Sequence, residues 1–463
     1  MRPKLTAGLL IFFSALVVYT LSLNGVYAID HATSFMELDY AIWTNHSFVL
    51  GSVANFKPGS VDDFKYDGNY YSALAPGTSI LSLPFFGAGL MLDGHFTLFG
   101  YAGLFSEFFV ALVNSAAASL VYLVGRFFFQ KNVSALLAFV YAFSTISWPF
   151  ATYFFQSDVS AALCLLAVYF AIRVARREHS QLRDSALAGT AVAVAMVVDY
   201  IDAVFLPIIL VYLLWVLKAK KESPAKPAVG FLATALVGIV SIGLYNYVNF
   251  GTAFRGTEQL YLHASSVFTE FSYPLYLGAY LNLFSPYRGL FIYSPFLLLG
   301  VFGFYDMVRD SLYKKEALLL LACFLGIFIP YSMWYDPTGG EGFGPRFLVA
   351  AIPFLLLPAG ITIQKGDSRL RLVAFALYAA GVFVNGIAGL TEAVTPMFNY
   401  ATSPFLSWTL PLFLRSGPDT WWLRYVGGGW EVPSVIIVAA AMSLPIVSDH
   451  FLARRSAVDP SNQ

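Results

Sequence analysis

The feature that most constrains this chain is a succession of apolar stretches long enough to cross a lipid bilayer. A spanning helix needs about 20 predominantly apolar residues. With 58% hydrophobic and only 12% charged residues, the chain lacks the composition of a soluble domain. We predict an all-α polytopic membrane protein, one transmembrane domain over residues 1–463, with about twelve spans. They are 5–24, 101–124, 133–151, 157–174, 185–200, 203–217, 228–248, 289–307, 316–334, 346–363, 371–391 and 433–449.

The basic residues give these spans an orientation. Of the 27 Lys and Arg residues, all but seven fall on the same side of the predicted spans as Met1. The exceptions are Lys57, Lys65, Arg255, Arg288, Arg346, Arg415 and Arg424. Because cationic flanks resist translocation, the side that carries Met1 is predicted to be cytoplasmic. We therefore expect a multi-pass protein of the cell membrane with both termini in the cytoplasm. The apolar run at the N-terminus is longer than a usual signal peptide core, which favours a retained first helix.

The predicted outer loops are long, and they should form an extracytoplasmic site. They cover residues 25–100, 249–288 and 392–432. The apolar segment 81–86 in the first loop predicts a short interfacial or re-entrant helix. The fifth and sixth spans meet at the acidic residues 199–202. Because carboxylates are costly inside a membrane, we expect a tight turn there at the outer surface.

Two acidic residues stand at the outer ends of predicted spans. Asp30 follows the first span, and Asp158 opens the fourth at a similar depth. Such carboxylates could act as a general base or hold a divalent cation. Each also has a simpler interpretation: Asp30 as a solvated acid at a helix end beside a surface His31, and Asp158 as a residue that caps helix amides.

The first outer loop contains a polar and aromatic run of the kind found on sugar-binding surfaces. It includes Lys65, Tyr66, Asp67 and Tyr71. Tyrosine rings can stack on a pyranose, and carboxylates accept hydrogen bonds from its hydroxyl groups. A plain hydrophilic loop would have a similar composition.

Two outward arginines break the charge bias and suggest an anionic partner such as a phosphate. Arg346 follows a glycine-rich segment that contains Glu341, and Arg288 lies in a similar position before Tyr293. Arginine binds phosphate with a planar, two-pronged donor set. The alternative for each is an arginine that reaches to lipid headgroups. His263 and Glu258, in the preceding loop, could contact a substrate or lie at the surface.

Several function classes are disfavoured by what the sequence lacks. There is no phosphate-binding P-loop, no dinucleotide-binding glycine fingerprint and no metalloprotease motif. A net charge of zero gives no reason to expect a nucleic acid partner.

Three stretches resemble polytopic glycosyltransferases that use polyprenyl-phosphate-linked sugars, the C-type fold group with protein O-mannosyltransferase-like and aminoarabinose transferase-like members. They are KYDGNYYSALAPGTSILSLPF in the first loop, LFSPYRGLFIYSPFLLLGVFG and GGEGFGPRFLVAAIPFLLLP. The order of the segments and the acid after the first span are similar to prokaryotic members. The fold that this implies has a long first outer loop with interfacial helices.

The resemblance also implies roles for particular residues. Asp30 would activate the acceptor, with Asp158 as a second acid, and a divalent cation such as Mg²⁺ or Mn²⁺ could be held by both. Arg346 would bind the donor phosphate, assisted by Lys65 and Arg288. The expected substrate contacts are Tyr66, Asp67, Tyr71, His263, Tyr293 and Glu341. His31 stands where protein O-mannosyltransferases carry a second acid, which leaves metal dependence and a protein acceptor open.

The predicted function is transfer of a sugar from a lipid-linked donor to a hydroxyl group of a glycan, lipid or protein at the outer face, with inversion. The alternative is a twelve-helix transporter or flippase of a glycolipid or small solute. That class normally has a long central cytoplasmic loop and short outer loops. Here the central loop, 218–227, is short and the outer loops are long, which favours the transferase. A non-catalytic lipid-binding scaffold is a third possibility.

Overall fold

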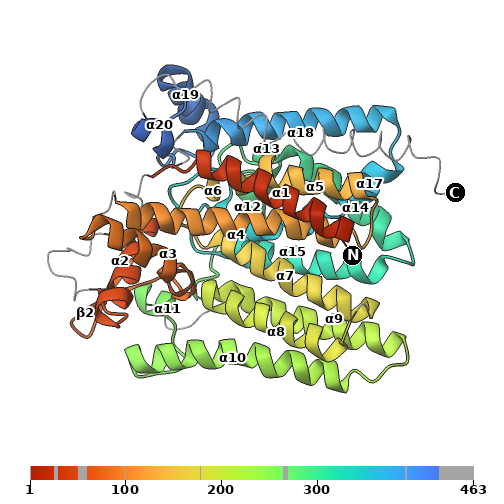
Figure 1. The fold of residues 1–463 in the computed structure, drawn as a ribbon, viewed down its shortest axis with the longest axis horizontal. Helices are drawn as coiled ribbons and strands as arrows, with labels where there is room; N and C mark the ends of the chain where they lie inside the picture. Colours follow the sequence, from red (N-terminus) through yellow and green to blue (C-terminus); the bar gives the residue numbers. More distant parts are fainter. Residues whose placement is uncertain are drawn as a thin grey trace.

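The computed structural model describes residues 2–25, 30–50, 60–97, 100–177, 179–263, 269–391 and 394–426. It is a bundle of helices, most of which run along one common direction (Figure 1). Eight helical segments among the described residues are long and apolar enough to cross a membrane. The predicted helical membrane fold is therefore confirmed, whereas the count of twelve spans is not. The twelfth predicted span, 433–449, lies outside the described residues.

The eight membrane-length segments correspond closely to predicted spans. They are α4 (Tyr101–Gly125), α7 (Ser157–Arg176), α8 (Gln181–Val198), η2 with α9 (Tyr200–Val204 and Phe205–Ala219), α10 (Ala225–Phe250), α15 (Lys314–Met333), η5 to α17 and α18 (Ser368–Gly389). The η5 to α17 segment comprises η5 (Arg346–Ala351), α16 (Ile352–Leu356) and α17 (Ala359–Lys365). The first predicted span is α1 (Arg2–Leu21).

Two predicted spans are broken in the structure. The segment 133–151 consists of α5 (Lys131–Phe143) and α6 (Ser147–Phe150). The segment 289–307 consists of α13 (Leu290–Tyr293), η4 (Pro295–Leu297) and α14 (Leu298–Arg309). The second break has a local cause. Ser294 takes the non-helical angles φ −139° and ψ 66° because a residue before proline is disfavoured in the helical region.

Close helix packing in the bundle depends on small residues. α8 packs along both α7 and α10, and α4 packs against α1 and α7. At Gly189 on α8, a Cβ atom would lie 2.2 Å from the carbonyl oxygen of Phe231 on α10. A larger residue there would push the two helices apart, as expected for helices that associate through backbone contact in a membrane.

The elements that come from the predicted outer loops gather at one end of the bundle (Figure 1). They include α2 (Asp30–Asn45), the hairpin of β1 (Asp63–Tyr66) and β2 (Asn69–Ser72), α3 (Gly77–Asp93) and α11 (Thr257–Tyr261). The beginning of α1 lies at the opposite end (Figure 1). The predicted helix at 81–86 is part of α3. The predicted outer loops also contain α12 (Leu275–Leu283), η6 (Phe405–Thr409), α19 (Leu410–Ser416) and α20 (Trp421–Val426).

The acidic turn at 199–202 forms where predicted, but its carboxylates point inward. Asp199 caps η2 by accepting a hydrogen bond from the backbone of Ile201 at 3.2 Å. Its other oxygen accepts a hydrogen bond from the Tyr331 hydroxyl at 2.6 Å, and Asp202 accepts one from Ser160 at 2.6 Å. These donors satisfy the two carboxylates. Asp202 is buried and residues 199–201 are half-buried, and the place of the turn at the outer surface of the membrane stays a prediction.

Candidate active site

A polar cavity of about 140 Å³ is lined in large part by elements from the predicted outer loops. Its walls come from α2, the loop before β1, the segment after β2, the start of α7, the turn between α8 and η2, α11, the end of α15 and η5. The charged and titratable residues in its lining are His31, Asp62, Asp199, Tyr200, Glu258, Tyr261, Glu270, Tyr331, Tyr335 and Arg346. We call this the polar cavity.

His31, on α2, contacts two other segments of the chain at the cavity wall. Its Nδ1 atom lies 3.0 Å from Asp62 Oδ2, and its Nε2 atom lies 2.8 Å from Gln156 Oε1. The ring stacks on Phe155 with the centroids 5.0 Å apart. His31 is only 6% exposed, so its interpretation as a surface residue is wrong. Since α2 begins at Asp30, its first turn directs His31 toward the cavity.

Asp62 is held as a carboxylate. Burial by itself would raise the pKa of Asp62, but the neighbouring His31 and the Arg346 guanidinium outweigh it and leave that pKa below its ordinary value. Asp62 therefore contributes a negative charge to the cavity at neutral pH.

Arg346 places its guanidinium between aromatic rings. The guanidinium carbon lies 5.4 Å from the ring centroid of Phe155 and 5.2 Å from that of Phe347. The Nε atom is buried and has no hydrogen-bond partner among the described residues. This is a cation that the aromatic faces hold in place.

Two further carboxyl groups face the same cavity. Burial raises the pKa of Glu270 to about 7, and burial together with the charges of Glu270, Asp62 and Asp199 raises the pKa of Glu258 to about 8. Glu270 is 7% exposed, and its Oε1 atom is buried without a partner in the described part of the chain. Both groups can therefore exchange protons near neutral pH and accept hydrogen bonds from a bound polyol.

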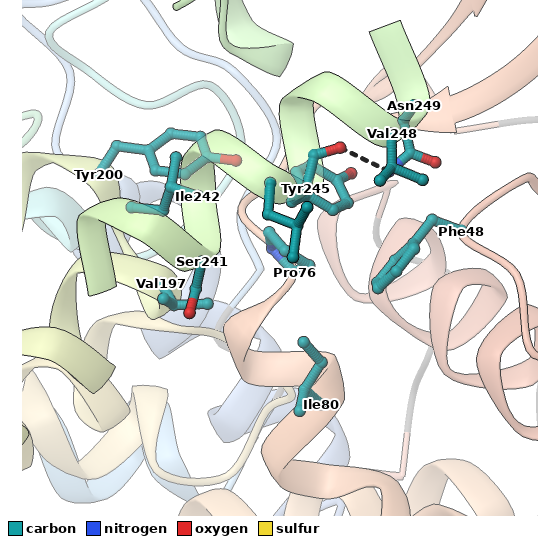
Figure 2. Close-up of a pocket in the computed structure, with 11 residues that line it drawn as sticks. Phe48, Pro76, Ile80, Val197, Tyr200, Ser241, Ile242, Tyr245, Val248 and Asn249 are labelled. Carbon is teal, nitrogen blue, oxygen red and sulfur yellow. Dashed lines mark hydrogen bonds between the residues drawn. The ribbon is translucent and has the colours of Figure 1, made fainter. Parts of the chain in front are cut away.

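An apolar pocket of about 290 Å³ lies beside the polar cavity. Figure 2 shows its walls, which include Phe48, Pro76, Ile80, Val197, Ile242 and Val248, contributed by α3, α8 and α10 among other elements. Tyr200 lines both spaces. The lining of the apolar pocket contains no Asp, Glu, Lys, Arg or His, so any acid–base chemistry belongs to the polar cavity.

The predicted acids Asp30 and Asp158 lie in different surroundings. Asp30 is half-buried, and its main-chain oxygen accepts a hydrogen bond from Ser60 at 2.6 Å. Asp30 directly precedes His31 of the cavity lining but does not itself belong to that lining. Asp158 is fully buried and accepts a hydrogen bond from Ser147 at 2.8 Å.

The residues around Asp158 form a buried network of their own. Ser147 also bonds to Asn114, and Tyr141 donates to Asn114 at 2.8 Å. Asp158 does not belong to the lining of the polar cavity. In the described part of the chain, no three His, Cys, Asp or Glu side chains are grouped to hold a metal ion. The metal-binding role expected of Asp30 and Asp158 stays a prediction.

The hairpin residues predicted to bind substrate mostly serve the fold. The Tyr66 hydroxyl donates to the carbonyl of Phe250 at 3.3 Å, and the Tyr71 ring packs on Phe250 with centroids 5.0 Å apart. Asp67 is exposed in the hairpin turn with φ 45°. The exposed Lys65 lies over the ring of Tyr70, with its Nζ atom 5.7 Å from the ring centroid.

The other predicted residues also lie outside the cavity lining. Arg288 is fully buried and donates hydrogen bonds to the carbonyls of Gly340 and Gly342. The Tyr293 hydroxyl, also buried, donates to the carbonyls of Pro286 and Tyr287 at 3.1 Å. Glu341 and His263 are exposed. Of the residues predicted to touch substrate or phosphate, only Arg346 lines the polar cavity.

Part of the chain matches the model of a known protein family. The model of a family described as dolichyl-phosphate-mannose-protein mannosyltransferase matches residues 84–245. These residues run from the middle of α3 to α10. No similar sequence was found among curated proteins.

Solved structures match over a larger part of the chain. ArnT from Cupriavidus metallidurans bound to undecaprenyl phosphate has a TM-score of 0.52 at 16% identity, over 94% of this chain and 75% of ArnT. The oligosaccharyltransferase from Archaeoglobus fulgidus in complex with Zn and sulfate has a TM-score of 0.52 at 14% identity, over 82% and 53%. The chain thus spans about half the length of the oligosaccharyltransferase.

The predicted resemblance is confirmed. The chain has the fold of ArnT and of the oligosaccharyltransferase, and the match to the mannosyltransferase family model agrees with the likeness inferred from the sequence.

Proposed function

We propose that the protein is a membrane glycosyltransferase that moves a sugar from a polyprenyl-phosphate donor to a hydroxyl group of an acceptor at the extracytoplasmic face. The observation that carries the proposal is the polar cavity, in which the Arg346 guanidinium and the carboxyl groups of Asp62, Glu258 and Glu270 converge. A cation for a leaving phosphate and acceptors for sugar hydroxyls are the groups that this reaction needs.

The reaction is a single displacement at the anomeric carbon. The acceptor oxygen forms a bond to that carbon as the bond from the carbon to the phosphate oxygen breaks, so the configuration inverts. The proton of the acceptor hydroxyl passes to a carboxylate, which we assign to Asp30, the residue directly before His31 of the cavity lining. The electron pair leaves with the polyprenyl phosphate, whose developing charge the Arg346 guanidinium stabilises.

The lipid chain of the donor has a place beside this chemistry. We assign it to the apolar pocket between α3, α8 and α10, since Tyr200 lines both that pocket and the polar cavity (Figure 2). Because the donor comes from the bilayer and not from water, packing against these apolar side chains would hold its isoprenoid chain there.

The orientation in the membrane completes the proposal. We place the polar cavity on the outer side, the beginning of α1 on the cytoplasmic side and both termini in the cytoplasm, with residues 1–463 forming one transmembrane domain. The distribution of Lys and Arg supports this placement. A divalent cation, for which Mg²⁺ or Mn²⁺ was expected, remains a proposal to test by adding a chelator.

The test is a transfer assay with the purified full chain in detergent and in sealed liposomes, using polyprenyl-phosphate sugars labelled in the sugar. We expect labelled acceptor and free polyprenyl phosphate to appear together, and Asp30→Asn to lower the rate about 100-fold or more. Uptake of label into liposomes without transfer would instead identify a transporter. Full activity of a correctly folded Asp30→Asn variant would refute the assignment of the base.

A further inference from the structure

A set of polar contacts holds the β1–β2 hairpin against α2. The Ser34 hydroxyl on α2 donates to Asp63 Oδ1 at 2.7 Å, and its oxygen lies 2.7 Å from that of Ser72. Asp63 and Ser72 face each other in the hairpin register, so one helix residue contacts both strands. Immediately before Asp63, Asp62 bonds to His31 at the wall of the polar cavity.

Glu37 adds a carboxyl group to this set. It lies one helical turn after Ser34 and is 1% exposed. Neither of its oxygens receives a hydrogen bond from an N–H or hydroxyl group of the described residues, and the Oδ2 atom of Asp63 is unpaired in the same way. Asp63 is the neighbouring side chain that acts on the Glu37 carboxyl group, so the two unpaired carboxyl groups adjoin each other. Two ionised carboxylates cannot share a buried site in this manner, so one of them carries a proton.

We infer that Glu37 is a positioning residue: its protonated carboxyl group donates to Asp63 and fastens the hairpin to α2. The fastened hairpin fixes Asp62 beside His31, and so fixes the wall of the polar cavity next to Asp30. The part of this inference that concerns catalysis rests on the proposed function. The part that concerns the hairpin does not.

The direction of the pH dependence follows from the state of Glu37. Burial, the hydrogen bond with Asp63 and the charge of Asp63 raise the pKa of Glu37 from 4.5 to about 10. At a pH between these two values, Glu37 is protonated while the hairpin is docked and loses its proton when the hairpin detaches. The docked hairpin is therefore less stable at higher pH. Within this window the equilibrium constant for its detachment rises by up to about tenfold per pH unit.

The other charged groups nearby do not supply that proton. Asp62, next to Asp63, is held ionised by His31 and Arg346. Asp39 on α2 faces away from the hairpin, where Ser82 donates to it at 3.0 Å and Ser106 at 3.4 Å. α3, which packs against α2, contributes Ser79 and Ser82 to this region.

Trypsin cleavage after the exposed Lys65 of β1 can report whether the hairpin is docked against α2. Trypsin can cut after Lys65 only when the strand leaves the sheet, because a protease needs an extended, accessible segment. Under brief digestion of the full chain in detergent, we expect Glu37→Ala to accelerate this cut at least tenfold at pH 7.5. Glu37→Gln keeps a neutral donor for Asp63, and we expect its cleavage rate within about threefold of wild type.

The pH series separates a shared proton from simple packing. Between pH 7.5 and 9.5 the ratio of the wild-type cleavage rate to that of Glu37→Gln should rise by up to about tenfold per pH unit, because glutamine has no proton to lose. Asp39→Asn is the matched control: it removes a buried carboxyl group from the same helix and should leave the cut after Lys65 unchanged. A flat ratio, or equal cleavage of wild type and Glu37→Ala, would overturn the inference. If Glu37→Ala does not fold, the comparison with Glu37→Gln still decides.

Transfer activity tests the catalytic part. We expect Glu37→Ala to lower kcat at least tenfold with a smaller effect on KM, and Glu37→Gln to retain most of the rate. Unchanged kcat in Glu37→Ala would reject the positioning role. If the wild type shows the predicted cleavage pattern but transfers no sugar, the proposed function fails and the contact between Glu37 and Asp63 stands.

Discussion

Arg288 and Arg346 are both predicted from the sequence to lie on the outer side, but their side chains have different roles in the structure. Arg288 is fully buried and donates to the carbonyls of Gly340 and Gly342, so its donors hold the glycine-rich loop. Arg346 lines the polar cavity, where its guanidinium lies between Phe155 and Phe347. A guanidinium that is already hydrogen-bonded to backbone carbonyls stabilises the fold, whereas one that lines a cavity is placed to bind an anionic ligand.

This difference predicts opposite effects for two matched substitutions. Arg346→Ala should lower the rate of sugar transfer about 100-fold or more and change the melting temperature in detergent little. Arg288→Ala should destabilise the protein by about 3 kcal/mol, because buried carbonyls lose charged donors. Melting curves and kcat/KM of the two variants measure both effects. A stable, fully active Arg346→Ala variant would contradict the assignment of the phosphate ligand.

At the level of single elements, the loop from Gly339 to Gly344 shapes the site. Gly339 and Gly340 adopt φ 70° and 65°, a region that other residues enter at a cost of about 1 kcal/mol or more. Asp336 fixes the loop from inside by accepting hydrogen bonds from the backbone of Thr338 at 3.1 Å and of Gly340 at 3.0 Å. The loop lies directly against Arg346, since a Cβ atom on Gly339 would lie 2.8 Å from Arg346 Nε.

Gly339 and Gly340 are adjacent in this loop, so the substitution Gly340→Ala is a control for Gly339→Ala. Gly339→Ala and Gly340→Ala carry the same backbone penalty, but a Cβ on Gly340 meets no atom within 4 Å. Both variants should lose similar stability. Only Gly339→Ala should displace the guanidinium and lower transfer by roughly tenfold or more, since small misplacements of a catalytic group are costly. Equal activity of the two variants would show that the loop does not position Arg346.

For the whole molecule, the distribution of elements matches the charge bias of the sequence. α2, β2, α3 and α11 lie at one end of the bundle, and the beginning of α1 lies at the other (Figure 1). Lys65 on the hairpin and Lys218 near the end of α9 are both exposed, and the predicted topology puts them on opposite sides of the membrane. The native cysteines, Cys164 and Cys323, are buried and free.

These features make the orientation measurable by cysteine labelling. In intact cells, a membrane-impermeant maleimide should label Lys65→Cys at once and Lys218→Cys only after permeabilisation. The wild type should give little background, because both of its thiols are buried. Labelling of Lys218→Cys from outside would invert the topology and move the polar cavity to the cytoplasmic side.

Apolar segment lengths and charge bias are local properties, so the sequence alone predicts a multi-span helical protein, its orientation and the glycine-rich loop before Arg346. The family resemblance is carried by short stretches that remain recognisable without a structure. Breaks such as the one at Ser294 depend on a proline that an average over hydrophobicity does not register.

Only the tertiary structure decides which polar groups meet. Asp62, Asp199 and Glu270 lie in three separate segments, and nothing in their local sequence distinguishes them from solvated loop acids. His31 becomes buried because Asp62 and Gln156, far along the chain, satisfy its two nitrogens. Asp158, predicted on its position at a helix start, bonds instead to Ser147 in the core. Hydrogen-bond satisfaction is a property of contacts between distant segments, and it determines which charges remain available for a substrate.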